Sequence, residues 1–247
     1  MCQIQTTFKG QAAIAAERAI ARNDADGLAL ILMKNPMVVH ETNSWGSPLL
    51  HVAVRAYRLP LVEMLLDAGS DINFLNHRPG GTTTALHGAA QPYGSQSEWI
   101  EATDLVTLLI ERGADPNLYA EQDPNSLAAP RTALQTSVSW SYEVSKLLVE
   151  AGADPNLMVG GRTALEVPLT TGHARMVRML VCDGSARLDG VIRERSFNGP
   201  RKIKWYLNEL SEFSKDDWRY GQAMETIMFV REALTDVAAA CENQQRQ

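Results

Sequence analysis

A six-residue phrase near the middle of the chain occurs four times, and this repetition constrains the fold more than any other feature. It reads RGADPN at 112–117, AGSDIN at 68–73 and AGADPN at 151–156, with a weaker copy, DGSARL, at 183–188. The glycines of the four copies occupy positions 69, 113, 152 and 184, so the successive intervals are 44, 39 and 32 residues. A period of about 33 residues with insertions predicts a stack of similar units rather than one globular core.

Each copy of the phrase ends a run of apolar residues with helical spacing. The runs are LVEMLLDAG, LVTLLIERG, VSKLLVEAG and MVRMLVCDG. We expect the glycine to end each helix, because glycine enters the left-handed conformation without steric cost. A second phrase precedes each run, reading PLLHVAV from Pro48, TALHGAA from Thr84, TALQTSV from Thr132 and TALEVPL from Thr163. Each unit is therefore predicted to contain two helices.

These phrases resemble the ankyrin repeat, whose pattern is T-P-L-H-x-A followed by two antiparallel helices, over about residues 45–189. The resemblance implies an all-α solenoid of stacked helix pairs with projecting finger loops. It also implies framework roles for Thr84, His87, Thr132 and Thr163, because in this family the threonine caps the first helix and its side chain bonds to the histidine. Three positions depart from the pattern. Gln135 and Glu166 stand where histidine belongs and Pro48 stands for threonine, so those repeats must satisfy their helix starts differently.

The weaker ends of the array are predicted to close it. The segments 11–22 and 27–34 have the size of a helix pair without the repeat phrases, so residues 1–43 are interpreted as a degenerate capping repeat with one polar face. Residues 44–189 hold the four ankyrin-like repeats. Residues 190–247 are predicted to form a C-terminal helical cap. In this cap an irregular connector leads to a helix starting at Pro200 and then to a longer apolar helix from about residue 216.

Three insertions enlarge the repeats. The connector 73–84 contains Gly80 and Gly81, which suit a projecting hairpin turn. Residues 91–103 add about eight residues between the two helices of one repeat, compared with the regular period. The finger 118–131 is longer still. Inserted loops often carry function, although a repeat array also tolerates them at little cost.

The resemblance implies that partners bind a concave face made of finger tips and the ends of the first helices. The residues predicted to bind are Trp45, Arg55, Arg131, Trp140 and Arg162. Tryptophan and arginine dominate many interfaces, and several arginines suit a protein partner with an acidic segment or a small molecule bearing a carboxylate. The alternative interpretation of the two tryptophans is that they cover neighbouring finger stems.

An enzyme or small-molecule binder is the alternative of a different class, with a pocket built from the long fingers and the 91–103 insertion. His77 could form an acid/base pair with Glu121 or Asp123, above a floor provided by Trp140. Glu166 could be an acid of raised pKa, although an ion pair with Arg162, four residues earlier, is the favoured interpretation. The chain contains no phosphate-binding glycine loop, HExxH, CxxC or GxSxG motif, so neither a cofactor nor a metal is expected.

Charge and cysteine content bear on partners and compartment. The chain has 23 basic and 29 acidic residues, and this balance argues against a general nucleic-acid binder. The basic run at 193–204 is short for a phosphate-binding field, and a localisation signal is its alternative interpretation. Three distant cysteines, no signal-peptide pattern and no long apolar run predict an intracellular, cytoplasmic protein that does not enter a membrane, with the nucleus as the alternative compartment.

The sequence thus predicts non-catalytic recognition of another protein on the concave face of an all-α solenoid. Two alternatives remain open at this point. One is the enzyme or small-molecule binder, and the other is a homo-oligomeric assembly subunit that associates through the apolar C-terminal helix.

Overall fold

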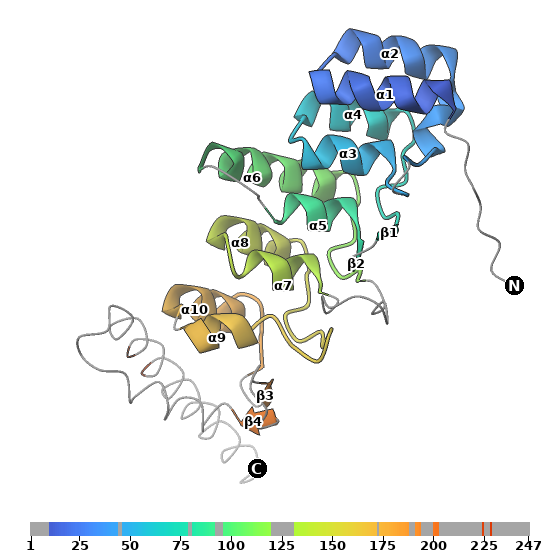
Figure 1. The fold of residues 1–247 in the computed structure, drawn as a ribbon. Coiled ribbons are helices and arrows are strands. Elements are labelled where there is room, and N and C mark those ends of the chain that lie inside the picture. The colour runs from blue at the N-terminus through green and yellow to red at the C-terminus, as the bar shows by residue number, and fades with distance from the viewer. Residues whose placement is uncertain are drawn as a thin grey trace, which may run out of the picture. The chain divides into compact units, whose positions relative to one another are not determined.

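The computed structural model describes residues 10–43, 46–78, 81–91, 96–119, 131–171, 173–187, 191–193 and 200–202, together with Met224 and Met228. It divides into two compact units, Met1–Leu147 and Leu148–Gln247, which are described separately (Figure 1). Most of the described residues are helical, and the strands are three-residue segments in two hairpins. The expected all-α class of stacked helix pairs is therefore confirmed.

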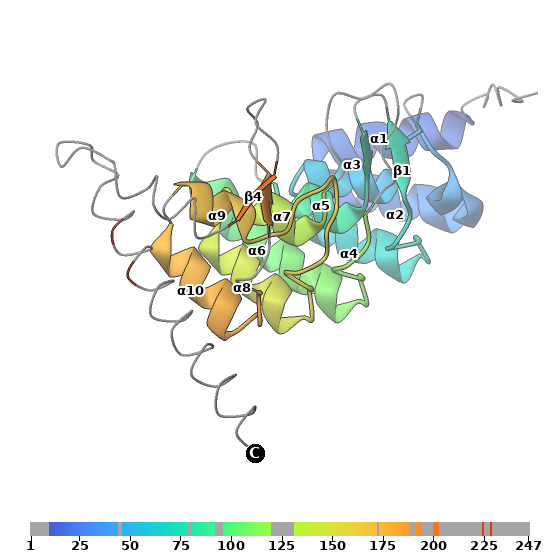
Figure 2. The same ribbon diagram turned by 90° about the horizontal axis from the view of Figure 1, so that it is seen from below.

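The first unit contains successive antiparallel helix pairs arranged in two layers. One layer consists of α1 (Gln11–Arg22), α3 (Leu49–Arg55), α5 (Ala85–Ala89) and α7 (Ala133–Ser137), each in contact with the next (Figure 2). The other layer contains α2 (Ala25–Lys34), α4 (Leu59–Asp67) and α6 (Gln96–Glu111), and α8 (Tyr142–Glu150) follows α7. A short 3-10 helix, η1 (Pro36–His40), joins the first two pairs.

The core of this unit lies between the two layers. Leucines from both helices of a pair are fully buried, including Leu50, Leu61, Leu86 and Leu105. Small residues allow the first helices to approach each other closely. A Cβ atom added to Gly88 of α5 would lie 3.3 Å from Val54 Cγ1 of α3. The short first helices are thus stabilised mainly by burial between neighbours, since helices of five to seven residues are marginal alone.

The predicted finger hairpin is present. Strand β1 (Asn76–Arg78) pairs antiparallel with β2 (Gly81–Thr83), with Arg78 opposite Gly81. This register leaves two residues between the strands, the connection length that favours tight hairpins. The hairpin leads directly into Thr84, the residue that caps α5.

The 91–103 insertion differs from expectation. It was predicted to lie between two helices, but residues from Gln96 onward belong to α6, which is 16 residues long against 9 for α4 and 9 for α8. Figure 1 shows the extra turns of α6 reaching past α5. The inserted segment continues the helical period of the run that follows it, so most of it lengthens a helix instead of forming a loop.

The second unit contains one described helix pair and two tight connections. Helix α9 (Glu166–Thr171) packs against α10 (Ala174–Cys182), and a bridge from Val159 to Arg162 closes a turn through two glycines of positive φ. Strand β3 (Val191–Arg193) pairs antiparallel with β4 (Pro200–Lys202).

The C-terminal connector corrects two predictions. It forms a β3–β4 hairpin where an irregular segment was expected, and Pro200 begins a strand, not a helix. Proline lacks the backbone N–H, so it suits the first residue of a strand as well as the first turn of a helix. Met224 and Met228, within the longer predicted helix, are helical, and the rest of that helix lies outside the described residues. Oligomerisation through it therefore stays an untested prediction.

Three of the four repeated glycines end their helices as predicted. Gly69, Gly113 and Gly152 have φ values of 92°, 91° and 89°, and no atom lies within 4 Å of a Cβ added there. The fourth copy is different. At the end of α10 the left-handed residue is Ser185, with φ 58°, and a Cβ added to Gly184 would meet the Leu180 carbonyl oxygen at 2.8 Å. The weaker fourth copy therefore places its glycine one residue before the left-handed position.

This displacement makes a stabilising substitution available. We expect Ser185→Gly to raise the free energy of unfolding by about 0.5–1 kcal/mol. The substitution removes the steric cost of a side chain in the left-handed conformation, and this gain exceeds the added conformational entropy of the unfolded chain. The matched control, Gly152→Ala, should lower it by about 1 kcal/mol for the converse reason. Urea denaturation measures both changes, and a less stable Ser185→Gly protein would contradict the explanation.

Asparagines of the repeated phrase connect neighbouring repeats. The Asn73 side chain donates to the Gly113 carbonyl (3.4 Å) and accepts from the Asp115 N–H (2.9 Å). In the second unit Asn156 makes the same pair of bonds with the Ser185 carbonyl (3.1 Å) and the Arg187 N–H (2.7 Å). The amide supplies both a donor and an acceptor, so Asn73 and Asn156 each fix one turn against the next.

Candidate binding surface

A reciprocal cap positions the start of α5. The Thr84 N–H donates to His87 Nδ1 (3.3 Å), and the His87 N–H donates to Thr84 Oγ1 (3.4 Å). On the other side of the ring, His87 Nε2 lies 2.6 Å from the Arg131 carbonyl oxygen. Since a carbonyl only accepts, Nε2 carries the proton and Nδ1 accepts, which defines a neutral imidazole. His87 therefore connects its own helix start to the backbone preceding α7.

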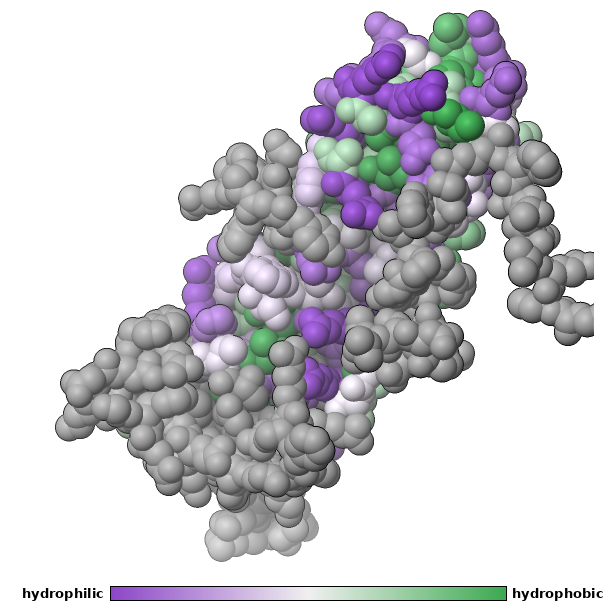
Figure 3. Space-filling view, in the orientation of Figure 1, coloured by the Kyte–Doolittle hydropathy of each residue, from purple (hydrophilic) through white to green (hydrophobic). Residues whose placement is uncertain are grey.

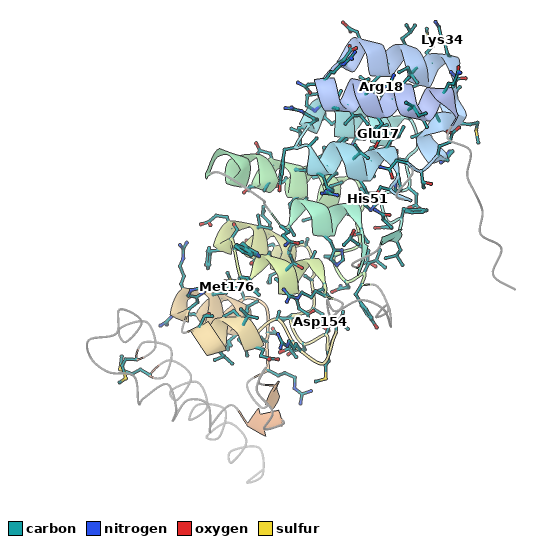
Figure 4. All side chains as sticks on the ribbon, in the orientation of Figure 1. Glu17, Arg18, Lys34, His51, Asp154 and Met176 are labelled. Atoms are coloured by element: carbon teal, nitrogen blue, oxygen red, sulfur yellow. The ribbon has the colours of Figure 1, made fainter. Side chains whose placement is uncertain are left out.

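The environment of His87 opposes protonation. Burial lowers the pKa of His87 below its ordinary value of 6.5, while the bond to the Arg131 carbonyl acts in the opposite direction. His51 in α3 makes the equivalent bridge, with Nε2 3.2 Å from the Thr83 carbonyl oxygen (Figure 4). Each of the two histidines therefore connects one first helix to the backbone that precedes the next.

The departures from the repeat pattern have structural solutions. Gln135 replaces histidine in the α7 cap, because Thr132 N–H donates to Gln135 Oε1 (3.1 Å) and Gln135 N–H donates to Thr132 Oγ1 (3.1 Å). Glu166 is buried at the start of α9, and its Oε1 lies 3.5 Å from Arg162 Nε. The predicted pairing of Glu166 with Arg162 is thus confirmed. Pro48 provides no side-chain cap for α3.

The other ends of the first helices form the candidate surface in the first unit, which we call the inner-end surface: Arg22, Arg55, Tyr57, Gln91 and Trp140. Arg22 and Arg55 are exposed in the last turns of α1 and α3, and Trp140, just after α7, is 49% exposed. Because α1, α3, α5 and α7 follow one another in a single layer, these ends are presented in sequence along it (Figures 1 and 2).

Three members of this surface, Arg22, Tyr57 and Gln91, are not among the residues predicted to bind. Arg22 belongs to the degenerate first helix pair. The sequence of this pair lacks the repeat phrases, so its residues could not be aligned with the binding positions of the other repeats. Tyr57 has φ 51°, which is rare for a bulky residue, and its hydroxyl donates to the Gln91 carbonyl (3.3 Å). The Tyr57 ring thus bridges the end of α3 to the end of α5. A strained backbone held by such a contact is a signal that only coordinates reveal.

The structure separates the other predicted residues. Arg131 is exposed, and its carbonyl accepts from His87. Arg162 lies in the second unit, paired with Glu166. Trp45, Glu121 and Asp123 lie outside the described residues, and for His77 only the backbone, in β1, is described. The acid/base pair proposed for His77 therefore stays a prediction. Within the described part of the chain, no group of three or more His, Cys, Asp or Glu residues could hold a metal ion.

Comparison with known families agrees with the fold. The model described as "Ankyrin repeats (3 copies)" matches residues 100–189, and the model described as "Ankyrin repeat" matches residues 45–77. The chain is an ankyrin-repeat protein. Repeats of this family generally act as protein–protein interaction modules. Comparison with curated proteins gives no significant match. None of the described helices is both long and apolar enough to cross a membrane.

Proposed function

We propose that this chain is a non-catalytic module that binds another protein on its concave face, centred in the first unit on the inner-end surface. The observation that carries the proposal is the exposure of Trp140 at the end of α7, in the layer that also presents Arg55. When a partner binds, an exposed tryptophan removes a large apolar area from water, and arginine supplies a planar set of hydrogen-bond donors. Residues of these two types most often dominate binding energy.

The charges on this surface support a partner with an acidic segment. Arg22 and Arg55 are both exposed at helix C-termini, where a cation also complements the helix dipole. Arg131, which lies outside the inner-end surface at the start of α7, is a third exposed cation and belongs to the finger that precedes this helix. Arg162 remains a proposed contact, but its pairing with Glu166 makes it a poor choice for a test of binding alone.

The remaining assignments are proposed with this function. Residues 1–43 act as an N-terminal capping repeat, 44–189 as the interaction module, and 190–247 as the C-terminal cap. An intracellular, cytoplasmic location is supported by the free, exposed thiol of Cys182, since exposed thiols persist in reducing compartments. Neither a cofactor nor a metal is part of the proposal.

We expect the double variant Arg55→Glu, Trp140→Ala to weaken partner binding by at least about 100-fold, equivalent to about 3 kcal/mol for two central contacts. Both side chains are exposed in the free protein, so the thermal midpoint should change little. The partner is first captured by a photo-crosslinking amino acid placed at position 140. Its affinity for the wild type and the variants is then measured by calorimetry.

The control variant carries Lys146→Glu, which alters an exposed cation of α8 outside the inner-end surface. It should bind like the wild type. Equal affinity of the wild type and the Arg55→Glu, Trp140→Ala variant for the crosslinked protein would refute the proposed surface. A small molecule that co-purifies with the wild type alone would favour the pocket alternative instead.

A further inference from the structure

The outer side of α2 does not have the polar face expected of a terminal repeat. Leu30 is 48% exposed and Met33 is 73% exposed, on the side of α2 opposite the buried Leu28 and Leu32. Met37 of η1, the element that follows α2, is 71% exposed. Figure 3 shows hydrophobic side chains at the surface of this N-terminal helix pair. Large apolar side chains on the outer side of a terminal helix are typical of a face that another surface covers.

The charged residues of α2 frame Leu30 symmetrically. Asp26 lies four residues before Leu30 and Lys34 lies four residues after it, and both are exposed. Residues separated by four or eight positions share one face of a helix, about 6 Å apart for each four-residue step. The exposed face thus reads acid, leucine, base along the helix axis. Figure 4 shows Lys34 at the outer edge of the pair.

We propose that this face binds the same face of a second copy of the chain, with α2 packed antiparallel to α2 across a two-fold axis at Leu30. In that register each Asp26 lies opposite Lys34 of the second copy, so this ion pair is made twice by symmetry. Opposed helix dipoles add a favourable contribution.

Three physical arguments favour a second copy over another occupant. The arrangement of charges is complementary to itself, which an isologous contact requires. The flexible side chains of the exposed methionines can adapt to an apolar surface, and in the dimer that surface is the same face of the second copy. The face is also separate from the inner-end surface, because it is formed by the outer-layer helix of the first pair. A dimer can therefore present two partner-binding surfaces.

A single helix face buries an area at the low end for stable interfaces, so we expect a concentration-dependent dimer with a dissociation constant of roughly 1–100 µM. Sedimentation equilibrium of the full chain over that range measures it. Leu30→Glu should raise the dissociation constant at least about tenfold, and Asp26→Lys should do so through two like-charge contacts. The double variant Asp26→Lys, Lys34→Asp restores opposite charges and should restore the dimer.

The control variant Met158→Glu introduces the same charge as Leu30→Glu, but at an exposed apolar residue of the second unit. It should leave the dimer unchanged. Thermal melts establish that each variant is folded. A dimer insensitive to Leu30→Glu, or one that the charge exchange does not restore, would overturn the proposal. A monomer at every concentration would also overturn it. If deletion of residues 2–9 then produces a dimer, the occupant of the face is the chain's own N-terminal segment.

Discussion

Replacing His87 with alanine is expected to lower the free energy of unfolding by about 3 kcal/mol, since three hydrogen bonds of a buried side chain are lost together. Two of these bonds join His87 Nδ1 to the Thr84 N–H (3.3 Å) and to Thr84 Oγ1 (2.8 Å), and the third is the 2.6 Å contact of His87 Nε2 with the Arg131 carbonyl. The loss affects both the helix start and the contact between consecutive repeats. Urea denaturation followed by circular dichroism measures the change.

The substitution His87→Gln provides the conservative control. Gln135 makes the reciprocal cap in the following repeat, so glutamine at position 87 should recover most of the stability that alanine loses. If His87→Gln is as damaging as His87→Ala, the cap does not explain the stability contributed by this histidine.

The wild type and His87→Gln should also differ in the pH dependence of their stability. Because burial lowers the pKa of His87, the unfolded chain binds a proton at this residue over a range where the folded chain does not. The stability that neutral His87 contributes is therefore fully present above pH 6.5, the ordinary pKa of histidine. It is lost as the pH falls from there through the lowered pKa of His87 in the folded state. Between about pH 7.5 and about pH 5.5 the wild type should lose more stability than His87→Gln. Equal losses would contradict this assignment.

Removing the cation beside Glu166 should have the second largest effect on stability. Arg162→Ala leaves a buried carboxylate without the guanidinium whose Nε lies 3.5 Å away, and we expect a loss of about 2 kcal/mol. The reversal Arg162→Glu should be more damaging, because it places two carboxylates together. Urea denaturation is again the measurement.

A double-mutant cycle isolates this interaction. In the Glu166→Gln background the buried charge is absent, and Gln135 shows that an amide is accepted at the corresponding position of the preceding repeat. Arg162→Ala should then cost less than about 0.5 kcal/mol, so the cycle should give a coupling energy of at least about 1.5 kcal/mol. An equal cost in both backgrounds would mean that Arg162 acts through packing alone.

Much of the fold was predictable because the determinants of each repeat are local. Gly69, Gly113 and Gly152 end their helices because glycine alone enters the left-handed conformation without steric cost. The finger hairpin was predicted from the adjacent Gly80 and Gly81. The pairing of Arg162 with Glu166 follows from helical spacing. Each of these predictions needs only a few neighbouring residues.

The errors occurred where local patterns allowed more than one outcome. Pro200 suits the start of a helix or of a strand, and the strand pairing of residues 191–193 with 200–202 decided between them. The 91–103 segment could be a loop or part of a helix, and most of it extends α6. In the fourth repeat the left-handed residue moved from Gly184 to Ser185, although the local phrase was similar.

The candidate site was predictable in residue type more than in arrangement. Arg55 and Trp140 were identified from their positions in the repeat, and both are exposed at the ends of first helices. Tyr57 could not be identified, because its role depends on a contact with Gln91, 34 residues further along the chain. The apolar outer side of α2 was also missed, since the sequence does not state which side of a terminal helix is covered.

The sequence by itself determined the repeating helix pair, its caps and its ankyrin-repeat class, because these depend on periodic apolar residues and on the backbone preferences of single residues. Only the tertiary structure decided which side chains connect one repeat to the next and which are exposed. Asn73 bonding to Gly113, His87 to Arg131 and the exposure of Met33 illustrate this. Each depends on the distance to a neighbour that is remote in sequence, and local pattern carries no information about that distance.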